Sequence, residues 1–186
     1  MPDGSISRLR PFGPKSEYIN VVIEAPKGSR TKFKYDAKSD LFIFHKMLPI
    51  GQSFPFDFGF VPATKAPDGD LLDVLILTDE PTFVGCLIHA RLLGVIEAQQ
   101  TENGKTNRND RLVAIPLETK SGKPPSGTID HLELNLARKL TKFFVVYNEL
   151  QDKGFKVLRY AGPDDAAKLI RRGMSGNRTR RKKRSR

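Results

Sequence analysis

The chain has 186 residues, of which 38% are hydrophobic and 9% aromatic, and it carries a formal net charge of +11. This composition is typical of one globular domain, and no apolar run approaches the ~20 residues that a membrane-spanning helix needs. Nine basic residues and no acidic residue lie between Arg171 and Arg186. The rest of the chain is therefore nearly neutral, which excludes a domain that binds nucleic acid through its overall charge.

The two ends of the chain differ in composition from its middle. Residues 1–18 are polar and rich in Pro and Gly, so we expect an extended arm, and they contain no apolar stretch like that of a signal peptide. A cytoplasmic location without membrane attachment is the resulting expectation. Residues 19–174 are predicted to form one folded domain. The basic end, residues 175–186, is predicted to be disordered.

From residue 19 to about residue 115 the pattern is one of short strands separated by turn signals. The predicted strands are Asn20–Glu24, Thr31–Tyr35, Leu41–Phe44, Val74–Leu77, Leu87–Ile96 and Leu112–Ile115. Strands that are this short and closely spaced favour an antiparallel barrel.

The last third of the chain changes to a helical period. Large apolar side chains recur every three or four residues and predict an amphipathic helix from about Ser126 to Gln151. A short strand is predicted over Phe155–Leu158. A second helix is predicted to begin at Pro163 and to end at Gly173.

Three carboxylates, Asp68, Asp70 and Asp73, lie within six residues directly before an apolar strand; we call them the signature aspartates. Carboxylates this close repel one another unless a cation lies between them. Mg²⁺ is the usual cation, because it takes oxygen ligands and leaves positions open for water and phosphate. The alternative is a solvated turn, which is the more frequent meaning of an isolated Asp-Gly-Asp sequence.

Other charged residues of the same β-rich part favour the functional alternative. Glu24, Lys32, Lys46 and Arg111 lie on different predicted strands, and a barrel can bring such residues onto one face. Carboxylates for metal ions, together with Lys and Arg for anionic oxygens, are typical of phosphoryl transfer to water. Taken one at a time, each lysine is more often an ordinary solvent-facing residue.

The segment Asp68–Val74 closely resembles the Asp-x-Asp-Pro-x-Asp-hydrophobic signature of soluble family I inorganic pyrophosphatases. The resemblance continues in order from about Ile19 to Leu158. It includes the strand that ends at Glu24, the aromatic stretch Phe54–Pro62 and the helical sequence Phe143-Phe144-x-x-Tyr147.

The resemblance implies a fold, a reaction and partners. The fold is mainly β with α: a five-stranded antiparallel barrel of the OB type with two flanking helices. The reaction is the hydrolysis of pyrophosphate to two phosphates by Mg²⁺-activated water, with several Mg²⁺ ions per subunit and Mn²⁺ or Co²⁺ as possible substitutes. A homo-oligomer is expected.

The resemblance also implies residue roles. The catalytic residues are Asp70, which orients and deprotonates the attacking water, and Glu24, a supporting acid. Phosphate oxygens are held by Lys32, Lys46, Arg111 and Tyr147. The metal ligands are Asp68, Asp70, Asp73, Glu102 and Asp110, with Asn109 as the alternative to Asp110.

Several positions depart from the family pattern. Lys34 stands where a Glu is usual, Lys46 where an Arg is usual, and Asn148 where a Lys is usual. Phe58 replaces a tyrosine, and Leu71 replaces the proline of the signature. These departures leave a second hypothesis open: a non-catalytic, degenerate protein of the same fold that binds phosphate, polyphosphate or nucleic acid. The basic end of the chain would add weak contacts with polyanions.

Overall fold

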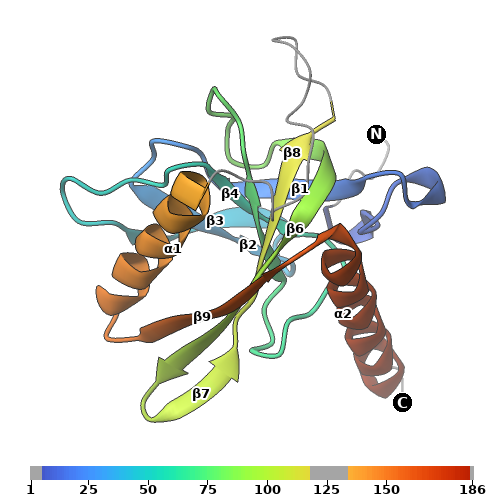
Figure 1. Cartoon of the computed structure of the whole chain (residues 1–186). Coiled ribbons are helices and arrows are strands. Elements are labelled where there is room, and N and C mark those ends of the chain that lie inside the picture. The colour runs from blue at the N-terminus through green and yellow to red at the C-terminus, as the bar shows by residue number, and fades with distance from the viewer. Residues whose placement is uncertain (1–5, 118–133, 185–186) are drawn as a thin grey trace.

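The computed structural model describes residues 6–117 and 134–184, which form a β-rich body with two α-helices (Figure 1). The strands are β1 (Ile19–Ala25), β2 (Thr31–Asp36), β3 (Leu41–Met47), β4 (Asp57–Val61), β5 (Leu72–Ile76), β6 (Leu87–Glu102), β7 (Lys105–Arg108), β8 (Arg111–Pro116) and β9 (Gly154–Ala161). The helices are α1 (Leu134–Glu149) and α2 (Pro163–Arg184), and two short 3-10 helices, Ile6–Arg8 and Pro14–Ser16, precede β1. None of the described helices is long and apolar enough to span a membrane.

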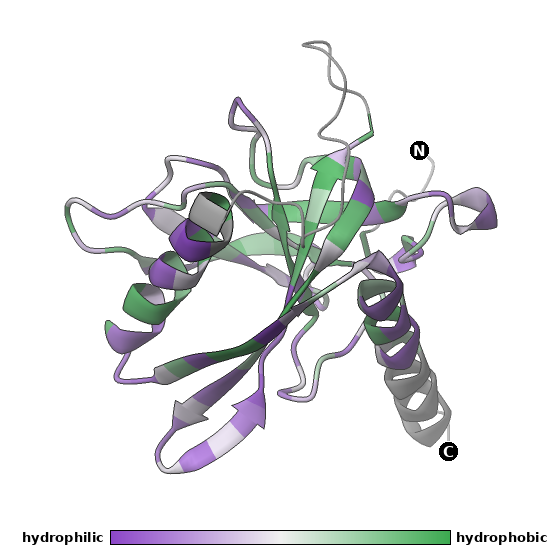
Figure 2. Ribbon diagram, in the orientation of Figure 1, coloured by the Kyte–Doolittle hydropathy of each residue, from purple (hydrophilic) through white to green (hydrophobic). Residues whose placement is uncertain are grey.

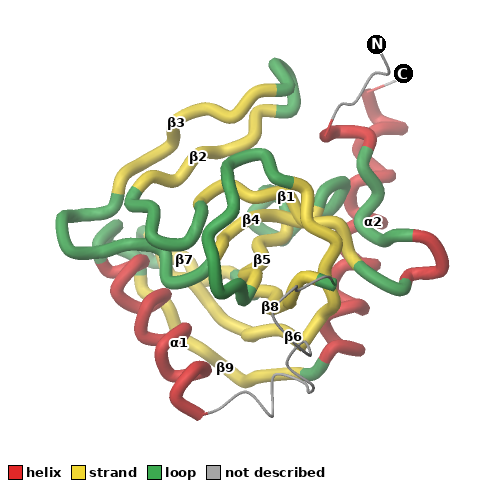
Figure 3. Tube along the Cα trace, turned by 90° about the horizontal axis from the view of Figure 1, so that it is seen from above, coloured by secondary structure: helices red, strands yellow, loops and turns green. Residues whose placement is uncertain are grey.

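Five strands close into a ring in the order β1-β4-β5-β8-β6, and β6 pairs back onto β1 (Figure 3). The predicted five-stranded barrel is therefore confirmed. Four of its pairings are antiparallel and one, β5 with β8, is parallel. One parallel pairing is unavoidable, because an odd number of strands in a closed ring cannot all run opposite to both neighbours. Outside the ring, β7 and β9 extend β6, and β2 pairs with β3.

Strand β4 was missed by the sequence patterns. All five of its residues are buried, so the apolar and polar alternation of a half-exposed strand is absent. Gly59 lies in its middle, which also weakens a strand prediction. The structure explains this glycine: a Cβ atom there would lie 2.2 Å from the carbonyl oxygen of Val22 in β1. The two backbones can approach this closely only because residue 59 has no side chain.

The two helices lie on opposite sides of the barrel (Figures 1 and 3). Strand residues alternate between two apolar clusters, as the period of two requires. In β5, Val74 belongs to a cluster that includes Ile170 of α2, while Leu75 belongs to one that includes Phe144 of α1. In Figure 2 the barrel strands are mostly green, which marks hydrophobic residues, and the hairpin formed by β7 and the end of β6 is mostly purple, which marks hydrophilic ones.

Helix α2 continues to Arg184, so the predicted helix end at Gly173 is wrong. One interior glycine costs a helix only about 1 kcal/mol, and basic side chains are favourable near a helix C-terminus. Gly173 serves packing: a Cβ there would lie 3.1 Å from Leu72 and 3.2 Å from the backbone of Lys65. The predicted start of the first helix, at Ser126, lies outside the described residues.

Candidate active site

The signature aspartates lie in and just after the turn that joins β4 to β5. Gly69 has a φ of 97°, and the backbone N–H of Ala66 donates to the carbonyl of Asp70 at 2.8 Å. The Asp68 carboxylate accepts a hydrogen bond from the backbone N–H of Asp70 at 3.0 Å. This Asx-type turn fixes Asp68 and Asp70 at the mouth of the barrel, and Asp73 follows as the second residue of β5.

Asp73 forms an ion pair with Arg111, the first residue of β8. One guanidinium nitrogen lies 2.9 Å from the carboxylate, and only 6% of the Arg111 side chain is exposed. The guanidinium also lies 5.3 Å from the centroid of the Phe144 ring in α1. Arg111 therefore links the barrel to α1 beneath the carboxylates.

Glu24, at the end of β1, is buried and pairs with Lys32 of β2 at 3.4 Å. Its carboxylate also accepts the backbone N–H of Tyr35 at 3.2 Å. Burial raises the pKa of Glu24 despite the nearby Lys32. Burial acts to lower the pKa of Lys32, but Asp73 and Glu24 hold that pKa above its ordinary value. Lys32 is therefore a cation held among anions, with its ammonium 4.3 Å from the centre of the Phe58 ring.

Lys46 of β3 meets the C-terminal part of α1. Its ammonium lies 4.4 Å above the ring of Tyr147 and donates to the Gln151 side-chain oxygen at 2.6 Å. Gln151 in turn donates to the carbonyl oxygen of Tyr147. Burial, with repulsion from Lys32, lowers the pKa of Lys46 to about 8. Burial raises the pKa of Tyr147, so its hydroxyl stays protonated.

Lys34, on the same strand as Lys32, contacts one of the signature aspartates, Asp70, directly. Its ammonium lies 2.8 and 2.9 Å from the two carboxylate oxygens of Asp70. Both side chains are well exposed. Lys34, which stands where a Glu is usual in the family, therefore binds the residue expected to be the base.

The Asp73 carboxylate lies at the electrostatic centre of these residues. It raises the pKa of Asp68 and Glu24 and favours the charged forms of Lys32 and Lys46. It also raises the pKa of the Tyr147 hydroxyl. Side chains from β1, β2, β3, β8, α1 and the turn before β5 thus surround one carboxylate, and the barrel brings together the residues expected from the sequence to hold substrate and inner metals.

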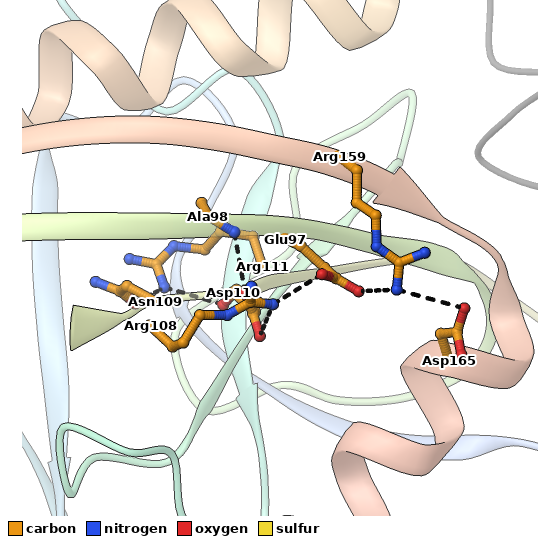
Figure 4. Close-up of polar contacts among 8 residues, drawn as sticks. All are labelled: Glu97, Ala98, Arg108, Asn109, Asp110, Arg111, Arg159 and Asp165. Atoms are coloured by element: carbon orange, nitrogen blue, oxygen red, sulfur yellow. Dashed lines mark hydrogen bonds and ion pairs between the residues drawn. The ribbon is translucent and has the colours of Figure 1, made fainter. Parts of the chain in front are cut away.

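Two of the expected metal ligands lie elsewhere. Glu102, at the end of β6, pairs with Lys153 at 3.1 Å. Asp110 accepts the backbone N–H of Ala98 at 2.9 Å and pairs with Arg108 at 2.9 Å. Figure 4 shows Asp110 at one end of a chain of alternating charges that continues through Glu97 and Arg159 to Asp165.

The side-chain amides of Gln100 and Asn109 lie where the β6–β7 hairpin meets the site, and Gln100 was not among the residues predicted from the sequence. The side chain of Asn109 donates to that of Gln100 and accepts a hydrogen bond from Arg111. Asn109 was expected only as the alternative to Asp110, and Gln100 was not expected at all. The signal was available, because residues i and i+2 share a strand face. Extended back from β8, which begins at Arg111, this period places Asn109 on the side of Arg111 and Asp110 on the other side, in agreement with their hydrogen bonds.

The residues present fit a metal on one side of the site only. Burial raises the pKa of Asp68, and repulsion by Asp70 and Asp73 adds to this effect, so a hard divalent cation would stabilise its ionised form. On the other side lie the cation of Lys34 and the neutral amides of Gln100 and Asn109, which do not fit further metal ions. Within the described residues, no three His, Cys, Asp or Glu side chains form a group that could hold a metal ion.

Comparisons with known proteins agree on one family. The family model described as inorganic pyrophosphatase matches residues 21–177. An inorganic pyrophosphatase of Synechocystis is 33% identical over 169 residues, 89% of this chain and 94% of that protein. One from Methanosarcina acetivorans is 34% identical over 156 residues, 84% of this chain and 90% of that protein.

The fold gives the same result. The crystal structure of an inorganic pyrophosphatase from Neisseria gonorrhoeae superimposes with a TM-score of 0.83 at 29% identity, covering 93% of this chain and 98% of that one. These matches span nearly the whole of both proteins, and the family model includes every site residue described above. The chain belongs to the inorganic pyrophosphatase family.

Proposed function

We propose that the chain hydrolyses pyrophosphate to two phosphates. The observation that carries the proposal is the gathering of carboxylates and cations from separate strands, with Asp73 paired with Arg111 at 2.9 Å and Glu24 paired with Lys32 at 3.4 Å. Lys46 lies over the Tyr147 ring beside these pairs, and Asp68 and Asp70 lie in the turn just before Asp73. A substrate with two linked phosphates needs this combination: cations and a hydroxyl for its oxygens, and a carboxylate for the attacking water.

The side chains divide the chemistry among them. Lys32, Lys46 and Arg111 hold phosphate oxygens and stabilise the charge that builds on the leaving phosphate, and the Tyr147 hydroxyl donates to another oxygen. Asp70, exposed at the mouth of the barrel, orients the water and accepts its proton, and Glu24 supports Lys32 from behind.

A metal ion would complete the site beside Asp68 and Asp73. Mg²⁺, when bound, lowers the pKa of a coordinated water and neutralises the leaving group. Asp68 and Asp73 would hold it through carboxylate oxygens, and Mn²⁺ or Co²⁺ would be acceptable substitutes with the same ligands.

Phosphate release from pyrophosphate tests the proposal. The purified full-length protein should release phosphate with Mg²⁺ and lose nearly all activity when the metal is chelated. Asp70→Asn keeps the size of the side chain and its hydrogen bond to Lys34, so the fold should persist while turnover is lost. Full activity in Asp70→Asn would remove the role assigned to Asp70.

One observation favours a second candidate, a non-catalytic protein that binds phosphate or polyphosphate. Lys34 engages both oxygens of Asp70, and neutral amides stand at the hairpin. Under this hypothesis the protein binds pyrophosphate in a calorimeter but releases no phosphate with Mg²⁺, Mn²⁺ or Co²⁺. The same purified sample therefore separates the two candidates.

We also infer a homo-oligomer that acts in the cytoplasm. Strand β3 and the turn after it expose several large apolar side chains, namely Leu41, Ile43, Phe44, Met47 and Ile50. Apolar groups gathered on one hairpin commonly mark a contact surface. Light scattering of the purified protein should give a mass several times 20.9 kDa, and a charged Ile50→Asp variant should give a smaller one.

The basic end of α2 is proposed to give weak contacts with polyanions. Its charge attracts nucleic acid or polyphosphate without sequence preference, and such binding falls steeply with salt. A chain lacking residues 175–186 should lose retention on a nucleic-acid column at low salt and keep its hydrolytic activity. Retention of the shortened chain would remove this assignment.

A further inference from the structure

The contact between Lys34 and Asp70 joins two residues from different parts of the site. Lys34 lies on β2, and Asp70 lies in the turn before β5. The ammonium reaches both carboxylate oxygens, at 2.8 and 2.9 Å, although 46% of one side chain and 61% of the other is exposed. An ion pair this exposed contributes little to stability. Its consequence is local: the carboxylate at the mouth of the site is already neutralised by a side chain.

The charges of the site balance without a metal ion. Four carboxylates face four cationic side chains drawn from β2, β3 and β8. The carboxylates are Glu24, Asp68, Asp70 and Asp73, and the cations are Lys32, Lys34, Lys46 and Arg111. Three of the pairs are direct: Lys32 with Glu24, Lys34 with Asp70, and Arg111 with Asp73. Asp68 has no ion pair among the described residues.

The hairpin side of the site adds no negative charge. The side chain of Asn109 donates a hydrogen bond to that of Gln100 and accepts one from Arg111. Neutral amides are weaker ligands than carboxylates for a divalent cation. Asp110, the nearest carboxylate in sequence, is held by Ala98 and Arg108 on the other face. Further metal ions would therefore meet the cation of Lys34 and the neutral amides of Gln100 and Asn109 in place of carboxylates.

We propose, resting on the function proposed above, that Lys34 is a built-in cation that takes the place of one bound metal ion on Asp70. Lys34 is a positioning residue: it holds the Asp70 carboxylate in one orientation and supplies a positive charge at the mouth of the site. The protein consequently binds fewer divalent ions than its carboxylates would otherwise hold, and the metal ions that it does bind lie near Asp68.

Counting bound Mn²⁺ tests this directly. Free Mn²⁺ gives a strong electron paramagnetic resonance signal that is lost on binding, so titration of the full-length protein yields the number of ions per chain without turnover. Lys34→Gln removes the charge but keeps the length of the side chain, and it should bind one Mn²⁺ more than the unaltered protein. Lys34→Arg keeps the charge and should bind the unaltered number. Lys38→Gln removes a lysine charge from the turn between β2 and β3 and is the matched control.

The dependence of phosphate release on Mg²⁺ provides a second measurement. Lys34→Gln should be at least about tenfold slower at low Mg²⁺ and should recover as Mg²⁺ rises, because a metal ion now supplies the missing charge. Lys34→Arg should restore the original dependence. Equal Mn²⁺ counts in Lys34→Gln and the unaltered protein would overturn the inference, as would a Lys34→Gln variant that is faster at every Mg²⁺ concentration. If the unaltered protein releases no phosphate, the proposed function fails, while the Mn²⁺ count still decides the role of Lys34.

Discussion

The guanidinium of Arg111 lies 2.9 Å from the Asp73 carboxylate and 5.3 Å from the centre of the Phe144 ring. Its side chain is nearly inaccessible, whereas 22% of the Asp73 side chain is exposed. A cation so placed does two things. It neutralises the central carboxylate of the site, and it fills space between β8 and α1 with the flat surface of the guanidinium.

Replacing Arg111 with Ala should lower the free energy of unfolding by about 3 kcal/mol, because a largely buried carboxylate loses its partner and a packed side chain is removed. Urea denaturation followed by circular dichroism measures this loss. In an Asp73→Asn background the same replacement should cost clearly less, since no charge is left unpaired. Equal costs in the two backgrounds would show that Arg111 acts through packing alone.

Lys46 predicts how substrate affinity changes with pH. Its pKa is lowered to about 8 by burial, so it carries a full charge at neutral pH and loses it above pH 8. Pyrophosphate is held partly by that charge, so KM should rise by about tenfold as the pH increases through this range, the loss of about 1.4 kcal/mol of binding. Lys46→Arg stays charged throughout, and its KM should not rise in the same way. A rise that persists unchanged in Lys46→Arg would assign the effect to another group.

Loss of the Lys46 proton weakens substrate binding but favours the folded state over the unfolded one. The folded pKa of Lys46 is about 8 and lies below its ordinary value of 10.5, so between these two values the unfolded chain binds more protons than the folded one. The contribution of Lys46 to the free energy of unfolding therefore rises with pH across this window and is constant below it. In Lys46→Gln this part of the pH dependence should disappear, as measured by urea denaturation at pH 7 and at pH 10.

Gly59 should not tolerate a side chain. An alanine Cβ would lie 2.2 Å from the Val22 carbonyl oxygen, and both atoms belong to paired barrel strands that cannot move independently. Gly59→Ala should cost about 3 kcal/mol or more of folding stability, at the upper end for overpacked cores. Gly154→Ala is a matched control, because its Cβ would meet Thr101 at an ordinary distance of 3.6 Å. A normal melting temperature for Gly59→Ala would contradict the closeness of β1 and β4.

The barrel was predictable because the local sequence pattern indicates most of its strands. The run ending at Glu24 and the run beginning at Val74 are apolar and bounded by turn residues, and the structure has strands at both. Strand β4 was not predictable in this way, since its glycine is explained only by the neighbouring strand. The parallel pairing of β5 with β8 is a property of ring closure that no single segment carries.

The candidate site was predictable where the motif is local and less so where it depends on register. The signature aspartates lie within six residues, so their proximity in space follows from their short separation along the sequence. The hairpin residues depend on which face each one occupies. Glu102 and Asp110 were expected as metal ligands because they are carboxylates, whereas the structure brings the amides of Gln100 and Asn109 to the site. The period of two, counted from Arg111, would have favoured Asn109 over Asp110.

Asp110 and Asn109 give a final prediction, because these neighbours between β7 and β8 have different partners: Asn109 contacts Gln100 and Arg111, and Asp110 contacts Ala98 and Arg108. Asp110→Asn keeps an oxygen for the backbone N–H of Ala98 and loses the ion pair with Arg108 (Figure 4). We expect a loss of stability of about 1 kcal/mol or less, since Arg108 is partly exposed, and an unchanged dependence of phosphate release on Mg²⁺. Asn109→Asp places a new carboxylate beside Arg111 and Gln100, so it should bind additional Mn²⁺ and shift the Mg²⁺ concentration that gives half-maximal activity severalfold.

Asp110→Asn and Asn109→Asp exchange the same two residue types at neighbouring positions. Their comparison therefore separates the effect of where a carboxylate lies from the effect of the total charge. If Asp110 were a metal ligand, Asp110→Asn would raise the Mg²⁺ requirement and lower the number of bound Mn²⁺ ions. If Asp110 instead belongs to the chain of alternating charges that ends at Asp165, removing its charge should weaken the packing of α2 on the barrel. Hydrogen exchange would then be faster in α2 and β9 and unchanged in the turn that carries the signature aspartates, because that turn is held by its own hydrogen bonds.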